Sequence, residues 1–431
     1  MFVRIDNTPR DYAWGSTTAI ARLLGRAPSG GPEAELWLGA HPGSPARIEG
    51  GAPAPDLAAW IAADPRTALG PALADADEAA GRTPHLPFLL KVLAAAAPLS
   101  LQAHPSPEQA AEGFARENAA GVPLDAPERN YKDPFHKPEM IFALSESFDA
   151  LCGFRPRAQL TGLLSRLRAA HQEAGDSAAA LTAFQARVAG AADDAGALRD
   201  AVAWLLAGGA EVAALVDEAV HAARLVLAEA GAEDFEEQGA LDPVLLPFQT
   251  VVALEEFAPS DPGIALSLLL NRVRLTRGQA LYLPAGNIHA YLGGLGIELM
   301  AASDNVLRGG LTPKHVDVPE LLRVLDFRPL PAPLLEPAEP APGVELFQPD
   351  VPDFELAHVV LDDGADAARI RLVAPAVAIV TAGSVELAGA TGGATLTQGQ
   401  AAYVTPDEAE LALRGAGELF LATARVEGAE V

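Results

Sequence analysis

Apolar and polar positions alternate between Leu281 and Leu292, as they do in a half-buried β-strand. The alternation is broken at 284–286, where the sequence reads Pro-Ala-Gly. It places His289 and Tyr291 on one face of the expected strand and the residues beside them on the other face. A histidine on the inward face of a small barrel can bind a metal ion, although a single such histidine is more often a hydrogen-bonded core residue.

A second alternating segment precedes a helix signal. Ser100, Gln102 and His104 share one face of this expected strand, and a proline follows directly. Ser106 to Gln109 then has the pattern of a capping box with proline at the first helical position. This pattern predicts a helix through about Asn118.

The apolar spacing becomes helical after about Pro156. Leu198 and Val202 recur at helical spacing, and a glycine pair at 208–209 marks a helix end. No further strand is expected before about Leu266. We therefore interpret this part of the chain as a helical domain inserted between two halves of a β domain.

The last third of the sequence returns to strand patterns. Asp317 caps a short predicted helix that ends near Phe327, and the proline- and glutamate-rich segment from Arg328 to Pro352 is expected to be a semi-rigid linker or an extended crossover. Alternating segments and glycine-rich turns predict a second all-β domain from Phe354 to Ala424. The predicted fold class is mainly β with an α-helical insertion, in four segments: the first β domain at 1–155 and 258–327, the helical domain at 156–257, and the C-terminal β domain at 328–431.

A short internal sequence similarity, here called the internal echo, relates the two β domains. The sequence T-R-G-Q-A-L-Y-L-P from Thr276 is similar to T-Q-G-Q-A-A-Y-V-T-P from Thr397. The second copy has no histidine where the first has His289, so we expect a degenerate domain without a metal there.

The charge of the chain restricts its partners. Thirty basic residues against 57 acidic ones give a formal charge of −27, which repels nucleic acid and anionic membranes. A small anionic substrate then requires a local basic pocket. Only four lysines occur, Lys91, Lys132, Lys137 and Lys314, and all lie inside or beside polar motifs.

The sequence also indicates the cellular compartment and the oligomeric state that we expect for the protein. The single cysteine, Cys152, excludes an internal disulfide and fits a reducing cytosol. No apolar run is long enough to cross a bilayer, and the N-terminal residues have no signal-peptide pattern. We expect a soluble cytoplasmic monomer.

Four polar residues form a plausible metal-ligand set. Two imidazoles and a carboxylate suit zinc, and a glutamine oxygen is an unusual but workable fourth donor. The set comprises Gln102, His104, Glu139 and His289. Their spacing alone is a weak signal, because the short zinc signatures are absent.

Five long motifs make the resemblance to a known family specific. They read P-F-L-L-K-V-L, L-S-L-Q-A-H-P-S, H-K-P-E-M, L-P-A-G-N-I-H-A-Y-L-G-G-L-G-I-E and S-D-N-V-L-R-G-G-L-T-P-K-H. In this order they resemble the type I mannose-6-phosphate isomerases, from Asp11 to Phe327. The resemblance implies cupin-type (jelly-roll) β-barrels, a catalytic one and a degenerate C-terminal one, and a single zinc held by Gln102, His104, Glu139 and His289.

The resemblance also implies roles for the remaining motif residues. Lys91, Ser100 and Lys314 match positions used toward the phosphate, and Tyr291 is a further candidate for substrate binding. Arg308 matches the catalytic arginine. The same cleft would be lined by His136, Lys137, Glu298 and Asp304. The implied reaction interconverts mannose 6-phosphate and fructose 6-phosphate through a cis-enediol, with zinc stabilising the developing charge.

Several alternatives stay open at the level of sequence. The base is one of Glu298, Asp304 or the His136–Lys137 pair; equally, Glu298 is a buried partner of Arg308, or Asp304 belongs to a turn. A non-catalytic sugar-binding metal cupin and a cupin-type glucose-6-phosphate isomerase are the alternative functions. The other histidines, among them His171 and His221, are interpreted as surface or structural residues.

Overall fold

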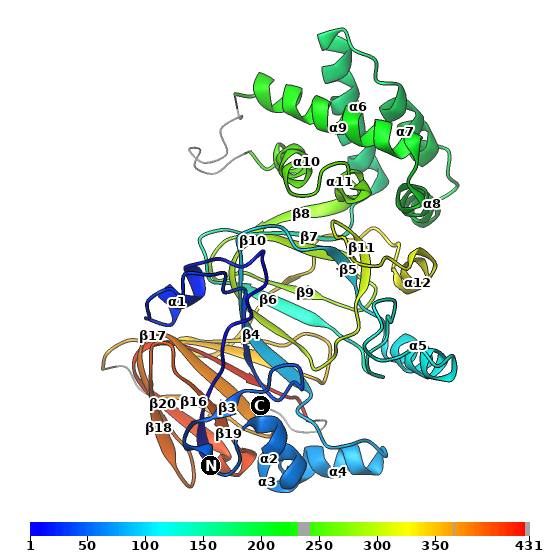
Figure 1. Ribbon diagram of the computed structural model, residues 1–431. Helices are drawn as coiled ribbons and strands as arrows, with labels where there is room; N and C mark the ends of the chain where they lie inside the picture. Colours follow the sequence, from blue (N-terminus) through cyan, green and yellow to red (C-terminus); the bar gives the residue numbers. More distant parts are fainter. Residues whose placement is uncertain (232–241, 365–366, 427–431) are drawn as a thin grey trace.

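The computed structural model describes residues 1–231, 242–364 and 367–426. Residues 232–241 of the predicted helical domain, and 365–366 and 427–431 of the predicted C-terminal domain, lie outside the described residues. Two antiparallel sheets and two groups of helices build the molecule, and Figure 1 shows the helices between residues 157 and 267 (green) above one sheet and the second sheet below it.

The first sheet contains the segments with the candidate site. Its strands are β2 (Glu35–Leu38), β4 (Phe88–Ala95), β5 (Leu101–Ala103), β6 (Glu139–Ala143), β7 (Phe148–Phe154), β8 (Leu270–Leu275), β9 (Ala280–Leu283), β10 (His289–Ala301), β11 (Leu307–Gly310) and β12 (Leu334–Leu335). β10 is 13 residues long and pairs with β5 and β7 near its start and with β4 and β6 along its second half.

The second sheet combines the C-terminal strands with two strands from the N-terminus. It consists of β1 (Phe2–Asp6), β3 (Arg47–Ile48), β13 (Ala338–Ala341), β14 (Val344–Phe347), β15 (Glu355–Leu361), β16 (Ala368–Arg371), β17 (Ala376–Ala388), β18 (Gly393–Thr397), β19 (Ala401–Val404) and β20 (Glu410–Thr423). Among the described strands, the pairing in neither sheet runs around a closed barrel.

The helices are α1 (Ala19–Leu23), α2 (Leu57–Ala63), α3 (Pro65–Leu69), α4 (Pro71–Ala79), α5 (Pro107–Ala119), α6 (Arg157–Ala174), α7 (Ala179–Ala189), α8 (Asp194–Ala207), α9 (Ala210–Glu229), α10 (Leu246–Phe257), α11 (Pro262–Ser267) and α12 (Val318–Val324). Two 3₁₀ turns, η1 (Glu49–Gly51) and η2 (Pro406–Glu408), complete the elements. None of the described helices combines the length and apolar character needed to cross a membrane.

The predicted fold class, mainly β with a helical insertion, is confirmed. The capping box before α5 is present in both directions, with Ser106 accepting from Gln109 and the Gln109 side chain accepting from Ser106. Asp317 caps α12 as predicted, although that helix ends at Val324 rather than near Phe327.

β4 and β6 of the first sheet are buried along their whole length, which separates their side chains into two buried environments. One set packs against the second sheet in a shared apolar core that includes Val92, Phe142, Ile297 and Phe420. The opposite face of β4, β6 and β10, here called the inner face, carries the residues that alternate with this set. Its apolar members, such as Leu93, Ile141 and Tyr291, form a separate cluster. The polar residues of these strands lie among them.

The helices α6 to α11 cover another part of the first sheet. Leu164, Val216 and Ile264 belong to one apolar core with Leu101 and Ile288 of the sheet region. The helical run extends to Ser267, ten residues beyond Phe257, and β8 begins at Leu270. Burial of this apolar face holds the insertion in place.

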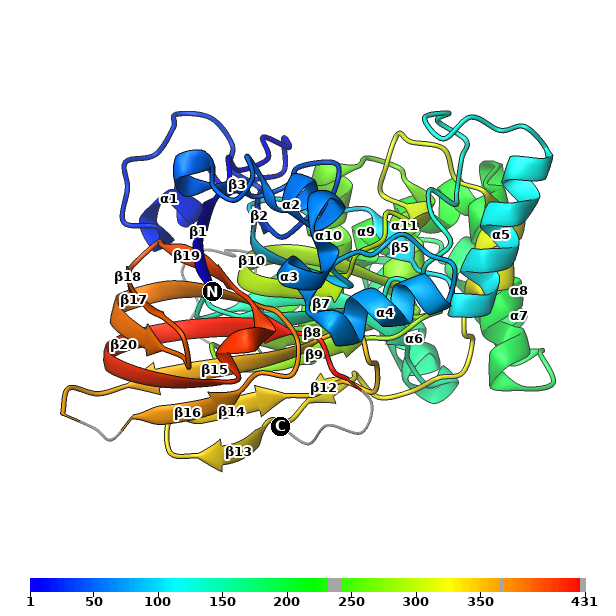
Figure 2. The same ribbon diagram turned by 90° about the horizontal axis from the view of Figure 1, so that it is seen from below.

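The structure differs from the expected domain organisation at two places, because strands pair across the expected boundaries. The segment expected to be a linker contains three short strands, and β14 pairs with β15 in the second sheet. Its proline and glutamate content hid these strands: β12 pairs with β9, whereas β13 pairs with β14 inside the segment itself. β1 pairs with β19, although the expected boundaries place these strands in different domains (Figure 2).

The internal echo corresponds to one repeated turn. The backbone N–H groups of Thr276 and Thr397 each donate to the side chain of the glutamine three residues later, at 2.9 Å in both copies. Gly278 and Gly399 have φ values of 92° and 83°, which favour glycine. β9 and β19 follow these turns.

Candidate metal centre

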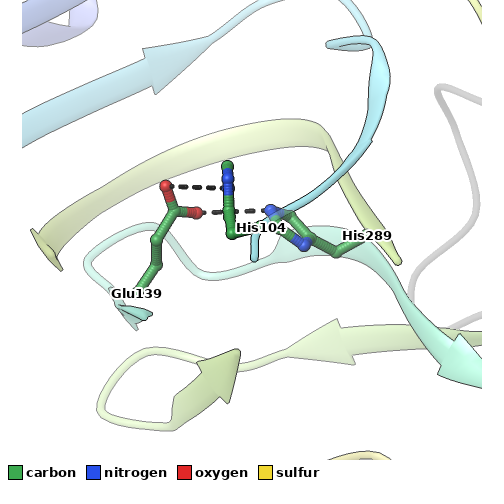
Figure 3. Close-up of side chains that lie close together, drawn as sticks. All are labelled: His104, Glu139 and His289. Carbon is green, nitrogen blue, oxygen red and sulfur yellow. Dashed lines mark ion pairs between the residues drawn. The ribbon is translucent and has the colours of Figure 1, made fainter. Parts of the chain in front are cut away.

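Three buried side chains from three strands converge on the inner face. His104 follows β5, Glu139 begins β6 and His289 begins β10, and each residue is 1% exposed. Figure 3 shows the Glu139 carboxylate facing both imidazoles, with a dashed line from the carboxylate to each of them. One ligand atom from each residue lies within 4.8 Å of the others. The structure thus brings together residues that are separated by up to 185 positions in the sequence.

The hydrogen bonding around the imidazoles leaves the right atoms free for a metal ion. His104 Nδ1 lies 2.7 Å from the Asn305 carbonyl oxygen, and His289 Nδ1 lies 3.0 Å from that of Asn287. Because these nitrogens donate to carbonyls, both Nε2 atoms carry a lone pair toward the centre.

The carboxylate lies opposite these lone pairs. Glu139 Oε1 is 3.3 Å from His104 Nε2, and Oε2 is 3.2 Å from His289 Nε2. Within the described residues, His104 Nε2 and Glu139 Oε2 find no well-directed hydrogen bond despite complete burial. Buried polar atoms without partners are rare, and a divalent ion between them satisfies all of them. The donor set therefore fits zinc.

Gln102 reaches the same centre from β5. Its Nε2 lies 3.3 Å from His289 Nε2, and the backbones of these two residues are paired in register. A half-turn of the amide exchanges its nitrogen and oxygen, which places an oxygen ligand at the same position.

The protonation states at the centre suit metal binding. Burial, followed by the positive charge of Lys137, lowers the pKa of His104 to about 4. Burial alone would raise the pKa of Glu139, but Lys137 and His104 hold it well below its usual value. Lys137 Nζ is 2.8 Å from Glu139 Oε1. Neutral imidazole and ionised carboxylate are the forms that bind metal ions.

A tight turn at Gly286 fixes the approach to His289. Gly286 has φ 76°, its N–H donates to the His104 carbonyl at 2.9 Å, and its carbonyl accepts from Asp326 at 3.0 Å. A Cβ at this position would lie 3.0 Å from the Val324 carbonyl oxygen. Only glycine combines this φ with such close packing, so the turn connects the backbones of both histidine segments.

A buried ion pair lies further along the inner face. Lys91 on β4 is paired in register with Glu298 on β10, and Lys91 Nζ donates to Glu298 Oε2 at 2.8 Å. Glu35 Oε1 is 3.6 Å from the same ammonium. Burial would lower the pKa of Lys91, but the two carboxylates raise it above its usual value.

Glu298 and Tyr291 have raised pKa values. Burial is the main cause for Glu298, the charge of Lys91 opposes it, and the negative charge of Glu139 adds to it. Burial, followed by the charges of Glu298 and Glu139, raises the pKa of Tyr291 well above its usual value. These effects place Tyr291, Glu298 and Glu139 in one electrostatic environment.

Arg308 and Lys314 form a cationic edge to the site. Arg308 is paired in register with Gln102, which places it beside the metal ligands. Burial lowers the pKa of Arg308, and burial followed by the charge of Arg308 lowers that of Lys314. Among the described residues, no carboxylate lies within 4.0 Å of either cation. An anionic group can therefore bind both without displacing a protein partner.

Other candidate residues have different partners. His136 Nε2 lies 2.8 Å from Asp353 Oδ2, near the second sheet. Asp304 Oδ1 lies 3.3 Å from His41 Nε2, and both residues line a cavity of about 610 Å³. Ser100 is half-buried directly before β5. The alternative in which Glu298 pairs with Arg308 is wrong, because Glu298 pairs with Lys91.

Sequence reasoning missed the residues that position the site. Asn305 is fully buried; its side chain donates to the carbonyls of Asp133 and Phe135 and accepts from Lys132 N–H. Its own carbonyl then orients His104. The motif S-D-N contained the signal, but an Asp-Asn pair is equally typical of an ordinary turn.

Comparisons with known proteins point to one family. A family-wide sequence profile described as phosphomannose isomerase type I, catalytic domain, matches residues 2–157. The mannose-6-phosphate isomerase of Escherichia coli is 38% identical over 418 residues, covering 96% of this chain and 98% of the relative. That of Bos taurus is 33% identical over 81% of this chain and 80% of its own length.

Solved structures agree with these matches. The apo form of mannose 6-phosphate isomerase from Salmonella typhimurium covers 98% of this chain and 99% of its own, at 36% identity and a TM-score of 0.80. A zinc-bound holo structure of mannose 6-phosphate isomerase has the same coverage and identity and a TM-score of 0.81. The similarity therefore extends over both sheets and the helical insertion.

Proposed function

This chain belongs to the type I phosphomannose isomerase family, and from that premise we propose that it interconverts mannose 6-phosphate and fructose 6-phosphate through a cis-enediol, with one zinc ion in its active site. The observation that carries the proposal is the buried group of His104, Glu139 and His289, whose free lone pairs converge beside an edge of unpaired cations. A sugar phosphate needs both parts. Its carbonyl requires polarisation and its phosphate requires positive charge.

Zinc would be held by Gln102, His104, Glu139 and His289, and when bound it supplies Lewis acidity to the sugar oxygens. Lys137 keeps Glu139 ionised and ready to bind the metal. Asn305 and Asn287 keep the two imidazoles in the tautomer that ligation requires.

Lys314 and Ser100 are proposed to hold the phosphate. The Lys314 ammonium is exposed, and no described carboxylate lies within salt-bridge distance of it. Arg308, which is paired in register with Gln102 and whose charge acts on Lys314, would stabilise the negative charge that develops during proton transfer. Binding the remote phosphate orients the reacting carbons.

Glu298 is the proposed base that moves the proton between C2 and C1. It is 3% exposed on the inner face, and its raised pKa is closer to neutrality than that of a free carboxylate. Asp304 has a lowered pKa, owing to His41 despite burial, and His136 is bonded to Asp353. Lys91 is then proposed to hold Glu298 in place, instead of making its expected contact with the phosphate. Tyr291, whose hydroxyl has no hydrogen-bond partner among the described residues, remains a proposed substrate-binding residue.

A coupled assay tests the main proposal. Zinc-loaded protein is offered mannose 6-phosphate and, separately, glucose 6-phosphate, and fructose 6-phosphate is measured with and without a chelator. We expect turnover of mannose 6-phosphate alone and its loss with the chelator. Turnover of glucose 6-phosphate alone would favour the alternative isomerase, and binding of sugar phosphate without turnover would favour a sugar-binding protein.

The fourth ligand has its own test. Gln102→Ala is expected to lower zinc content and the turnover rate together, because the amide oxygen completes the donor set. Gln109→Ala, a glutamine of the α5 capping box, serves as the matched control. Unchanged zinc and turnover in Gln102→Ala would remove Gln102 from the ligand set.

We further propose that the protein acts as a cytoplasmic monomer. The single cysteine, Cys152, is buried, which fits a chain that needs no disulfide. Light scattering after gel filtration should give about the chain mass of 44.6 kDa. A mass twice as large would contradict the monomer.

A further inference from the structure

A second cluster of metal-binding side chains lies in the helical insertion. It consists of His171 in the last turn of α6, Asp176 just after that helix, and His221 in α9. One ligand atom from each residue lies within 4.8 Å of the others. None of these residues belongs to β5, β6 or β10, and Figure 1 shows α6 and α9 above the first sheet.

The end of α6 places Asp176 next to His171. Gly175 adopts a left-handed conformation with φ 82°, and its N–H donates to the Gln172 carbonyl at 3.1 Å. The N–H of Asp176 donates to the His171 carbonyl at 2.9 Å, so the chain turns back over the last helical turn. An ordinary helix-ending motif therefore accounts for the position of the Asp176 carboxylate.

His171 has the hydrogen bonding of a metal ligand. Its Nε2 lies 2.8 Å from the carbonyl oxygen of Glu218, so this nitrogen carries the proton. Its Nδ1 is completely buried and has no hydrogen-bond partner among the described residues, and the residue is 4% exposed. A neutral imidazole that donates from one nitrogen to a backbone carbonyl and keeps a lone pair on the other is the form that binds metal. Burying that lone pair without a partner is otherwise unfavourable.

His221 and Asp176 complete the cluster from the solvent side. His221 Nε2 lies 3.0 Å from Asp176 Oδ2, and the two side chains are each 51% exposed. The rings of His171 and His221 are 5.1 Å apart between centroids and tilted by 55°. The exposed pair is open to solvent, and the net charge of −27 favours the approach of a cation.

We propose that His171, Asp176 and His221 form a second divalent-metal site, separate from the isomerase centre, that binds a borderline transition ion such as Zn²⁺. Two imidazoles and one carboxylate are a donor set that suits zinc, with water filling the remaining position. The ion joins the end of α6 to the middle of α9. The Glu218 carboxylate on α9 accepts from the N–H groups of Ala180 and Leu181, so α7 is joined to α9 one turn from His221.

Zinc stoichiometry tests the proposal without reference to catalysis. Protein is equilibrated with excess Zn²⁺, passed through a desalting column, checked for folding by circular dichroism and analysed for zinc by mass spectrometry. The wild-type chain should retain two zinc ions. His221→Ala and His171→Gln should each retain one; the glutamine amide preserves the hydrogen bond to Glu218. His315→Ala, which removes an exposed histidine elsewhere, should retain two.

A variant of the isomerase centre distinguishes zinc binding at the two sites. His289→Ala, which removes a ligand of the isomerase centre, should still retain one zinc ion and show visible absorption bands with Co²⁺. The double variant His289→Ala/His221→Ala should lose both the ion and the bands. A single zinc in the wild-type chain, or an unchanged zinc count in His221→Ala, overturns the proposal. An equal loss in His315→Ala would show nonspecific surface binding and overturn it as well.

Discussion

Lys91 and Glu298 face each other across β4 and β10, with their charged atoms 2.8 Å apart on the buried inner face. Apolar side chains such as Leu93 and Ile141 lie on the same face. Two buried charges on one sheet are costly to desolvate, and their hydrogen bond and attraction offset that cost only while both are present. We therefore expect substitution of Glu298 to affect mainly catalysis and substitution of Lys91 to affect mainly stability.

Glu298→Gln is expected to reduce kcat by about 10²- to 10⁴-fold, the usual contribution of a positioned base. The amide keeps the shape of the side chain and its hydrogen bond from Lys91 but cannot accept the C2 proton. Zinc content should stay the same, since Glu298 is not in the ligand set. Asp304→Asn is the matched control at the other acidic candidate, and a larger loss of kcat there would move the base to Asp304.

Lys91→Met is expected to lower the free energy of unfolding by about 3–5 kcal/mol, because it leaves a buried carboxylate without its cation. The cost should exceed that of Glu298→Gln, since Lys91 retains Glu35 at 3.6 Å when Glu298 is neutralised. Urea unfolding at neutral pH measures the free energy of unfolding of both variants. Equal stability of Lys91→Met and wild type would show that the pair contributes nothing in solution.

Lys314→Met is expected to raise KM for mannose 6-phosphate roughly tenfold to hundredfold with little change in kcat, as for the loss of one hydrogen bond to a charged group. The inhibition constant of inorganic phosphate should rise with it, because the lost contact is to the phosphate alone. Lys132→Met is the control, since Lys132 donates to the Leu124 carbonyl instead. A fall in kcat at constant KM would place Lys314 in the chemical step.

Asn305→Ala is expected to weaken zinc binding by about 10- to 100-fold, the usual effect of losing a residue that orients a metal ligand. The substitution removes the bonds that hold residues 132–135 and frees the carbonyl that orients His104. Competition with a chelator measures the affinity. Asn130→Ala, at an asparagine that bonds Asp317, should bind zinc like the wild type; identical affinities in all three proteins would refute the positioning role.

The lowered pKa of Glu418 leads us to expect that the stability of the fold depends on pH. Burial would raise its pKa, but hydrogen bonds from His358 and Thr381 and the charge of Arg277 lower it to about 2. Because the folded pKa lies below the unfolded value, the carboxylate stabilises the fold above about pH 4.3 and this contribution is lost as the pH falls toward 2.

Glu418→Gln should therefore cost about 2 kcal/mol at pH 7, as for removal of a charged hydrogen-bond partner, and much less at about pH 2. Unfolding by urea across this pH range gives the difference. Glu410→Gln, an exposed partner of Arg369 on the same strand, should change stability by less than about 1 kcal/mol at either pH. A constant difference between wild type and Glu418→Gln at all pH values would contradict the argument.

Local signals in the sequence predicted local structure well. The caps of α5 and α12 are set by residues within four positions of one another, so the sequence contains all the information needed. Alternation likewise placed His289 and Tyr291 at the start of a strand. Partners that meet only through the fold were not predictable. Nothing near Lys91 in the sequence indicates Glu298, and nothing near His136 indicates Asp353.

The pairing of β1 with β19 has a consequence for synthesis. Ribosomes add about 5–20 residues per second, so Phe2–Asp6 waits roughly 20–80 s before residues 401–404 exist to receive it. During that interval Val3 and Ile5, both buried in the finished molecule, have no sheet to enter beyond a two-residue contact with β3. β1 is thus made early but reaches its final place only after β19 has been synthesised, and until then its apolar side chains are open to wrong contacts.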